Sequence, residues 1–130
     1  MIKFAYTICY VRDVEKTLSF FTNTFSFKIK FITEDKDYAE LNTGDTVLAF
    51  ANEKLGNSNL SDGFICLSDS KKPLGIEIAF VTDEVESTHQ HALKNGAKEL
   101  NPPITKPWGQ KVSYIRCPSG ILIELCTPMS

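Results

Sequence analysis

Residues 8–13, Ile-Cys-Tyr-Val-Arg-Asp, recur 70 positions later as Ile-Ala-Phe-Val-Thr-Asp at residues 78–83. Each stretch has the form of an apolar strand that ends just before a helix. The closing aspartate, Asp13 or Asp83, is suited to cap that helix, because a short carboxylate accepts hydrogen bonds from the free backbone N–H groups of the first turn. Such a repeat predicts two halves with the same local architecture.

The apolar pattern extends this order through both halves. Helical spacing follows each aspartate, and alternating apolar and polar residues mark the strands. In the first half the pattern predicts a strand over 4–11, a helix from 14, and strands over 27–31, 38–42 and 46–51. In the second half it predicts a strand over 75–82, a helix ended by Gly96, and strands over 98–101, 110–116 and 121–126. The predicted fold class is therefore α+β: two tandem β-α-β-β-β modules that form a curved mixed sheet, with helices on its outer face and a central cleft.

The chain of 130 residues fits one domain. We expect module one over about 1–52, a connection over about 53–74 and module two over about 75–130. The connection is rich in Asn, Ser, Gly and Lys but contains the apolar island Phe64–Leu67. It is either a lid over a binding site or a plain linker whose island forms a short edge strand.

The composition limits the binding partners and the cellular location that can be expected. The formal net charge is −2 and no run of basic residues stands out, so neither nucleic acid nor a membrane is an expected partner. No stretch has the length of a membrane span or the pattern of a signal peptide. The four cysteines lack metal-ligand or C-x-x-C spacing and are expected to be free thiols. These features favour a cytoplasmic protein.

Residues 106–110, Lys-Pro-Trp-Gly-Gln, lead to residues 117–126, Cys-Pro-Ser-Gly-Ile-Leu-Ile-Glu-Leu-Cys. With residues 10–14 and 80–83, this pattern resembles the vicinal oxygen chelate superfamily, which includes glyoxalases, bleomycin-resistance proteins and extradiol dioxygenases. The family usually shows Asp-Pro-Asp-Gly where this chain has Cys-Pro-Ser-Gly, and the Pro and Gly preserve the turn. The resemblance implies a small organic ligand and a two-fold homodimer.

The metal-dependent members of the family hold an ion with four side chains, two from each module. The resemblance places those positions at Tyr6, Ala49, Ile76 and Glu124. Only Glu124 is a good ligand, because alanine and isoleucine have no donor atom and a phenol must first ionise. We therefore expect no metal and no cofactor at this position.

Without a metal, the cleft becomes a mostly apolar cavity. Strand alternation places Tyr6 and Glu124 in it as candidate catalytic residues. The candidate ligand-binding residues are Ile8, Tyr10, Val47, Ala49, Ile76, Ile78, Phe80, Trp108 and Leu122. Glu124 is flanked by apolar residues and is costly to bury unless it is paired or used. Trp108 could stack on a ligand, cap the core or form a dimer contact.

Three functions follow from these features. The first is metal-free binding that sequesters a toxic or drug-like compound, as in the bleomycin-resistance proteins. The second is a metal-independent lyase or isomerase, with Glu124 as general base and Tyr6 as hydrogen-bond donor to an oxyanion. The third is a metal-dependent glyoxalase- or dioxygenase-type enzyme. His89 and His91 lie two apart in a helix that covers the outer face, so we expect packing or surface roles for both.

Overall fold

A computed structural model describes residues 1–129 of the chain. Module one contains β1 (Tyr6–Val11), α1 (Val14–Phe25), β2 (Lys28–Ile32), β3 (Tyr38–Asn42) and β4 (Val47–Asn52). Module two contains β5 (Glu77–Val81), α3 (Val85–Lys94), β6 (Lys98–Thr105), β7 (Lys111–Arg116) and β8 (Leu122–Cys126). The predicted α+β fold of two β-α-β-β-β modules is confirmed.

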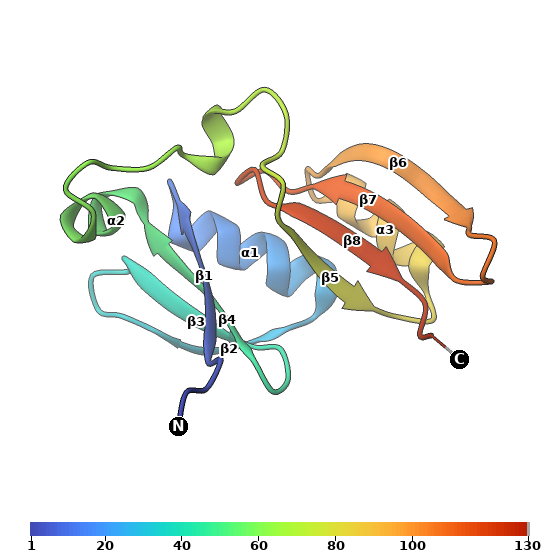
Figure 1. The fold of residues 1–130 in the computed structure, drawn as a ribbon, viewed down its shortest axis with the longest axis horizontal. Helices are drawn as coiled ribbons and strands as arrows, with labels where there is room; N and C mark the ends of the chain where they lie inside the picture. Colours follow the sequence, from blue (N-terminus) through green and yellow to red (C-terminus); the bar gives the residue numbers. More distant parts are fainter. Residues whose placement is uncertain (130) are drawn as a thin grey trace.

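Each module forms its own four-stranded mixed sheet, in the order β1-β4-β3-β2 and β5-β8-β7-β6 (Figure 1). The first strand of each module lies at a sheet edge and pairs in parallel with the last strand. The crossover through the helix makes this parallel pairing possible, because a hairpin joins only antiparallel strands. The other pairs in each sheet are antiparallel.

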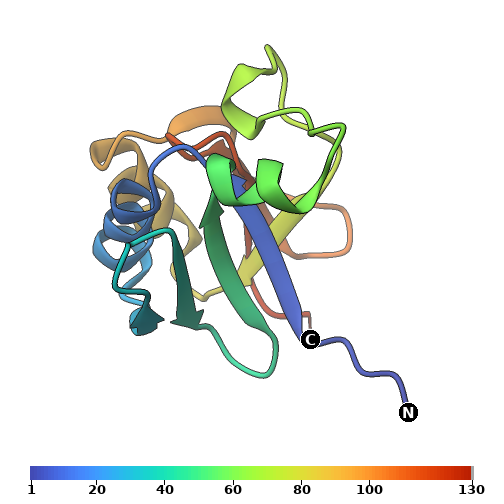
Figure 2. The ribbon, with the colours of Figure 1, turned by 90° about the vertical axis from the view of Figure 1, so that its left-hand side faces the viewer.

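Helices α1 and α3 lie together on one side of the molecule, with β1 on the other side (Figure 2). We call the helix-covered face of each sheet, described above as the outer face, its core face. The opposite face, which was predicted to line the cleft, is called the outer face from here on. α1 begins at Asp13, whose carboxylate accepts from the backbone N–H of Lys16 across 2.9 Å. Its apolar side, including Leu18 and Phe21, is buried against the core face of module one.

The two modules share part of their core. The ring of Phe80, on β5, packs against Phe25 and Phe27 of module one, with both centroid separations 5.0 Å. It also contacts Phe21 edge-on. Phe80 was expected in the cleft, but it lies in this aromatic contact between the modules.

The repeat spacing of 70 is wrong by one residue in the first strand and helix of module two. The pairing of the parallel strands places equivalent positions 71 apart, as between Tyr6 and Glu77. The matching pairs are Tyr6–Val47 and Ile8–Ala49 in module one, and Glu77–Leu122 and Ala79–Glu124 in module two. The N-cap position of α3 is accordingly Glu84, not Asp83, and the Glu84 N–H donates to Thr82 Oγ1 across 3.0 Å.

This slip reverses the faces of β5. Side chains alternate along a strand, so a shift of one residue moves each of them to the opposite face. Ile78 and Phe80 pack against the common core, whereas Glu77, Ala79 and Val81 are exposed on the outer face. The prediction that Ile76, Ile78 and Phe80 match Tyr6, Ile8 and Tyr10 is therefore wrong.

The connection between the modules is more ordered than a linker. Asn52 caps the helix α2 (Glu53–Asn59) by accepting from the backbone N–H of Leu55 across 2.8 Å. A short 3-10 helix, η1 (Leu67–Asp69), follows. Residues 64–66 form no strand, so the edge-strand alternative for the apolar island is wrong. None of the helices within residues 1–129 has the length and apolar character needed to cross a lipid bilayer.

Candidate functional site

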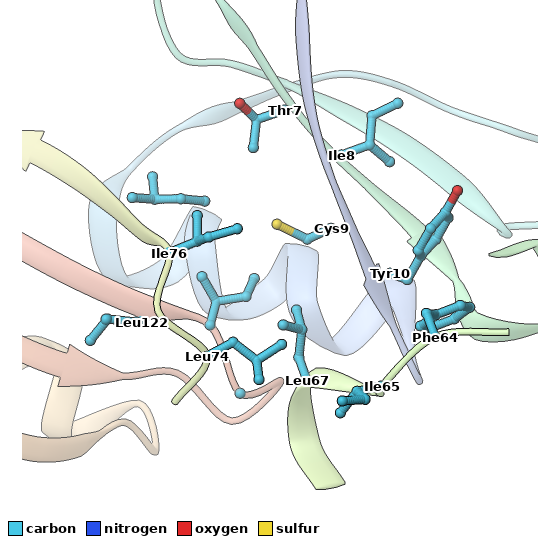
Figure 3. A pocket seen from close by; sticks show the side chains of 13 residues that line it. Thr7, Ile8, Cys9, Tyr10, Phe64, Ile65, Leu67, Leu74, Ile76 and Leu122 are labelled. Atoms are coloured by element: carbon cyan, nitrogen blue, oxygen red, sulfur yellow. The ribbon is translucent and has the colours of Figure 1, made fainter. Parts of the chain in front are cut away.

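A cavity of about 260 Å³ lies between β1, the start of β5 and the segment that joins the modules. Thr7 and Cys9 point into it from β1, opposite Ile76, whereas Ile8 and Tyr10 point to the other side of β1 (Figure 3). The full lining comprises Thr7, Ile8, Cys9, Tyr10, Phe64, Ile65, Leu67, Leu74, Ile76, Ile78, Gly120, Ile121 and Leu122. None of these side chains is charged.

The roof of the cavity is formed by residues 64–71, which we call the strap. Its apolar island is turned toward the cavity, through Phe64, Ile65 and Leu67. Phe64 also stacks on Tyr10 with a centroid separation of 4.8 Å. Gly56 permits this stack, because a Cβ there would lie 2.7 Å from the Phe64 ring.

The strap is fastened to both modules. From module two, the Arg116 guanidinium donates to the carbonyl oxygens of Leu67 at 2.7 Å and Ser70 at 3.1 Å. Arg12 of module one forms an ion pair with Asp69 of the strap. These bonds engage the charged groups at the strap, and neither arginine lines the cavity.

Gly120 brings the strap close to the turn before β8. It has a φ of +94°, and a Cβ at this position would lie 2.5 Å from the carbonyl oxygen of Leu67. Glycine is required here both for the positive φ and for the close approach. The Pro-Ser-Gly turn therefore contacts the strap closely, in addition to joining β7 to β8.

A second group of polar residues lies outside the cavity, on the outer face of sheet two. Glu77 and Glu124 lie on the paired strands β5 and β8, with their carboxyl groups close together. Hydrogen bonding to Glu124, then desolvation and the charge of Glu124, raise the pKa of Glu77 to about 7. Tyr114 donates to Glu124 Oε1 across 3.0 Å, and its own pKa is raised to about 12, first by desolvation and then by this bond.

Sequence reasoning did not find Glu77, because the spacing of 70 assigned its place to Ile76. Two neighbouring carboxyl groups oppose each other's ionisation, and this contributes to the raised pKa of Glu77. The strand pairing gives the register that places Glu77 beside Glu124. The sequence match of residues 8–13 with 78–83 favoured a different register, with a spacing of 70.

Five of the residues predicted to bind a ligand line the cavity: Ile8, Tyr10, Ile76, Ile78 and Leu122. Val47 and Phe80 lie at a separate surface pocket with Ile78, and Ala49 is buried in β4. Trp108 lies in the β6–β7 turn, where it is 62% exposed and its indole donates to Gln110 across 3.0 Å. Tyr6 is on the edge strand of sheet one and Glu124 is inside sheet two, so the two candidate catalytic residues belong to different sheets.

The metal position of the resembling family does not fit the residues present. Ala49 has no donor atom, and Tyr6 would have to ionise. The structure replaces Ile76 with Glu77 at the third position, so two of the four positions, Glu77 and Glu124, carry a good ligand. Within residues 1–129, no group of three or more His, Cys, Asp or Glu side chains is arranged to hold a metal ion.

The two histidines lie away from the cavity. His89 is fully buried, with hydrogen bonds from Nδ1 to Ser113 Oγ at 2.9 Å and from Nε2 to Glu99 Oε2 at 2.7 Å. Ser113 is also fully buried, so this serine–histidine–glutamate arrangement is closed to a substrate. His91 is exposed and bonds to the carbonyl oxygen of Asn23, which links α3 to α1.

All four cysteines are free thiols. Burial raises the pKa of Cys9 to about 11, and a hydrogen bond to Glu53 raises that of Cys66 to about 11. Burial also raises the pKa values of Cys117 and Cys126. The thiols are therefore protonated at neutral pH and are weak nucleophiles.

The family model of the Glyoxalase/Bleomycin resistance protein/Dioxygenase superfamily matches residues 3–125. The chain belongs to this superfamily.

Relatives match nearly the whole chain, one in sequence and two in fold. The chain is 25% identical to the uncharacterised protein YraH of Bacillus subtilis over 122 residues, which cover 88% of this chain and 90% of YraH. A glyoxalase-related enzyme from Fulvimarina pelagi superposes with a TM-score of 0.82 at 17% identity, covering 98% of this chain and 89% of that one. The hypothetical protein SA1046 of S. aureus gives a TM-score of 0.79 at 17% identity, with coverage of 98% and 95%.

Proposed function

We propose that the protein binds a small organic molecule without a metal, in the cavity beneath the strap, and that it sequesters a toxic or drug-like compound without converting it. The observation that carries this proposal is a preformed apolar cavity whose roof is fastened to both modules. Ligand sites are concave, mostly apolar and largely preformed, so the cavity has the expected character. The superfamily includes bleomycin-resistance proteins, which supports sequestration as its purpose.

The test is a thermal-shift screen of drug-like and aromatic compounds, followed by calorimetry on the hits. We expect one ligand per chain, and mass spectrometry should recover it unchanged after incubation. Leu74→Trp, which places a large ring in the cavity wall, should abolish binding. Leu60→Trp is the matched control, because Leu60 is exposed and does not line the cavity. Equal loss in both variants, or no hit in the screen, would refute the proposal.

Glu77 and Glu124 favour a second candidate function, that of a metal-independent lyase or isomerase. A carboxyl group that titrates near pH 7 is suited to general acid–base catalysis. Tyr114, which already bonds Glu124, replaces Tyr6 as the neighbouring phenol donor in this scheme. Turnover that is lost in Glu124→Gln while binding persists would favour this candidate over sequestration.

We also propose that the chain pairs as a homodimer through the outer face of sheet one. Tyr6, Ile8 and Phe31 are 53, 46 and 44% exposed there, and clustered exposed apolar side chains mark association surfaces. Light scattering after size exclusion should give twice the chain mass. Phe31→Lys should shift the population toward monomer, and a monomeric wild type would contradict the proposal. The free thiols agree with a cytoplasmic location, which we retain as part of the proposal.

A further inference from the structure

We infer that the ligand of the cavity beneath the strap is an uncharged apolar molecule of one or two rings. This inference rests on the proposed function and adds the chemical class of the ligand. It departs from the sequence expectation that Glu124 lies in the cavity, because Glu124 does not line it.

The low polarity of the cavity wall indicates an uncharged ligand. Among its side chains, only the Thr7 hydroxyl, the Cys9 thiol and the Tyr10 phenol are polar. The raised pKa of Cys9 keeps its thiol neutral, and the Tyr10 ring is turned to the far side of β1, where its phenol oxygen lies 3.4 Å from the Asn59 amide nitrogen. A charged ligand group would lose its hydration here without gaining an ion pair.

The neighbouring charges are engaged elsewhere. The basic groups that fasten the strap, Arg12 and Arg116, bond to acceptors of the connection. The carboxyl groups of Glu77 and Glu124 lie on the outer face of sheet two. None of these four side chains lines the cavity, so none is placed to neutralise a charge on the ligand.

The size of the cavity sets the second limit. Drug-sized ligands occupy pockets of about 300–1,000 Å³. An engineered apolar cavity of about 150 Å³ takes benzene. The cavity of about 260 Å³ lies between these values and therefore suits one or two fused rings.

The rim supports an apolar ligand. Ile65 and Ile76 are 69 and 78% exposed and both contribute to the cavity. Two solvent-exposed isoleucines at the cavity form a surface that an apolar molecule would cover favourably. A ligand seated between Cys9 and Ile76 would bury part of this rim.

The test uses three naphthalene probes of matched shape: 2-methylnaphthalene, 2-naphthoate and 2-naphthylmethylammonium. Each is titrated at pH 7 into the ¹⁵N-labelled full chain and followed by chemical-shift changes. We expect the neutral probe to bind at least about tenfold more tightly than either ion, with the largest shifts at Thr7, Cys9 and Ile76.

A charge placed in the wall should reverse this order. Ile76→Asp should weaken the neutral probe and admit the ammonium probe, and the high exposure of Ile76 makes the change tolerable for folding. Ile29→Asp is the control, since Ile29 is 46% exposed but lies outside the cavity. It should leave the order of the three probes unchanged.

Two results would overturn the inference: equal affinity for the neutral and charged probes, or shift changes centred away from the cavity. In either case the proposed function would stand if the compound screen gives a ligand that Leu74→Trp excludes. If no compound in the screen and no probe binds, the proposed function fails, and the inference with it.

Discussion

The guanidinium group of Arg116 donates to the carbonyl oxygen of Leu67 across 2.7 Å and so ties β7 to the roof of the cavity. The same side chain also donates to the carbonyl oxygens of Ser70 and Gly120. The strap is therefore expected to be a fixed part of the fold.

Removing the guanidinium should loosen the strap. Hydrogen bonds to charged groups contribute about 1.5–3 kcal/mol each, so Arg116→Met should lower the free energy of unfolding by about 3 kcal/mol. Urea unfolding measures this loss, and limited proteolysis should show new cleavage within residues 60–74. Lys111→Met, which removes only an exposed ion pair with Glu86, is the control and should change little. Equal protease resistance of Arg116→Met and wild type would contradict a fastened strap.

Gly120 should be far less replaceable than Gly44. Both have positive φ, +94° and +116°, so alanine strains either position by about 1–3 kcal/mol. At Gly44 nothing lies within 4 Å of the added Cβ, whereas at Gly120 it would clash with the Leu67 carbonyl. Gly120→Ala should therefore exceed Gly44→Ala by at least about 1 kcal/mol in thermal or urea unfolding. Indistinguishable losses would show that the strap yields without cost.

Glu77 should make stability depend on pH. Its folded pKa, about 7, lies above that of an unfolded glutamate, so the folded chain binds more protons between these two values. This contribution is fully present below the unfolded pKa and is lost as the pH rises through about 7. Stability should accordingly fall from pH 5 to pH 8, and Glu77→Gln should flatten that segment of the profile. Thermal melts across this range provide the measurement. A wild-type profile that matches that of Glu77→Gln would contradict the raised pKa of Glu77.

His89 should prove structural and His91 dispensable. His89→Ala leaves a cavity and removes the partner of buried Ser113, which should cost about 3 kcal/mol. His91→Ala removes one exposed hydrogen bond and should cost about 1 kcal/mol or less. Denaturant unfolding compares the two. Neither variant, if folded, should alter probe binding to the cavity, and a specific loss of binding in His91→Ala would show a role that its position does not explain.

The scaffold could be predicted from sequence because its signals are local. Asp13 begins a helix, Gly96 follows one, and strand alternation is visible wherever one face is buried. α2 was missed, because a polar segment of seven residues lacks an apolar face, although its cap, Asn52, was present in the sequence.

The site was harder to predict because it depends on strand pairing. The identity of Val11 and Asp13 with Val81 and Asp83 supported a spacing of 70, yet the structure aligns the first strands and helices at 71. This shift of one residue decides whether Ile76 or Glu77 lies at the third metal position of the family. The pairing with β8 fixes the register, and the alternating Ile78 and Phe80 mark the core face of β5 and not the face of the metal position.

The Phe80 ring, held among phenylalanines of module one, links the folding of the two halves. Module one expressed alone would lack the Phe80 ring between its phenylalanines. Module two expressed alone would expose that ring to water. The two modules therefore share an architecture but are not independent folding units. The halves should unfold in one cooperative step, and substitutions in one should be felt in the thermodynamic stability of the other.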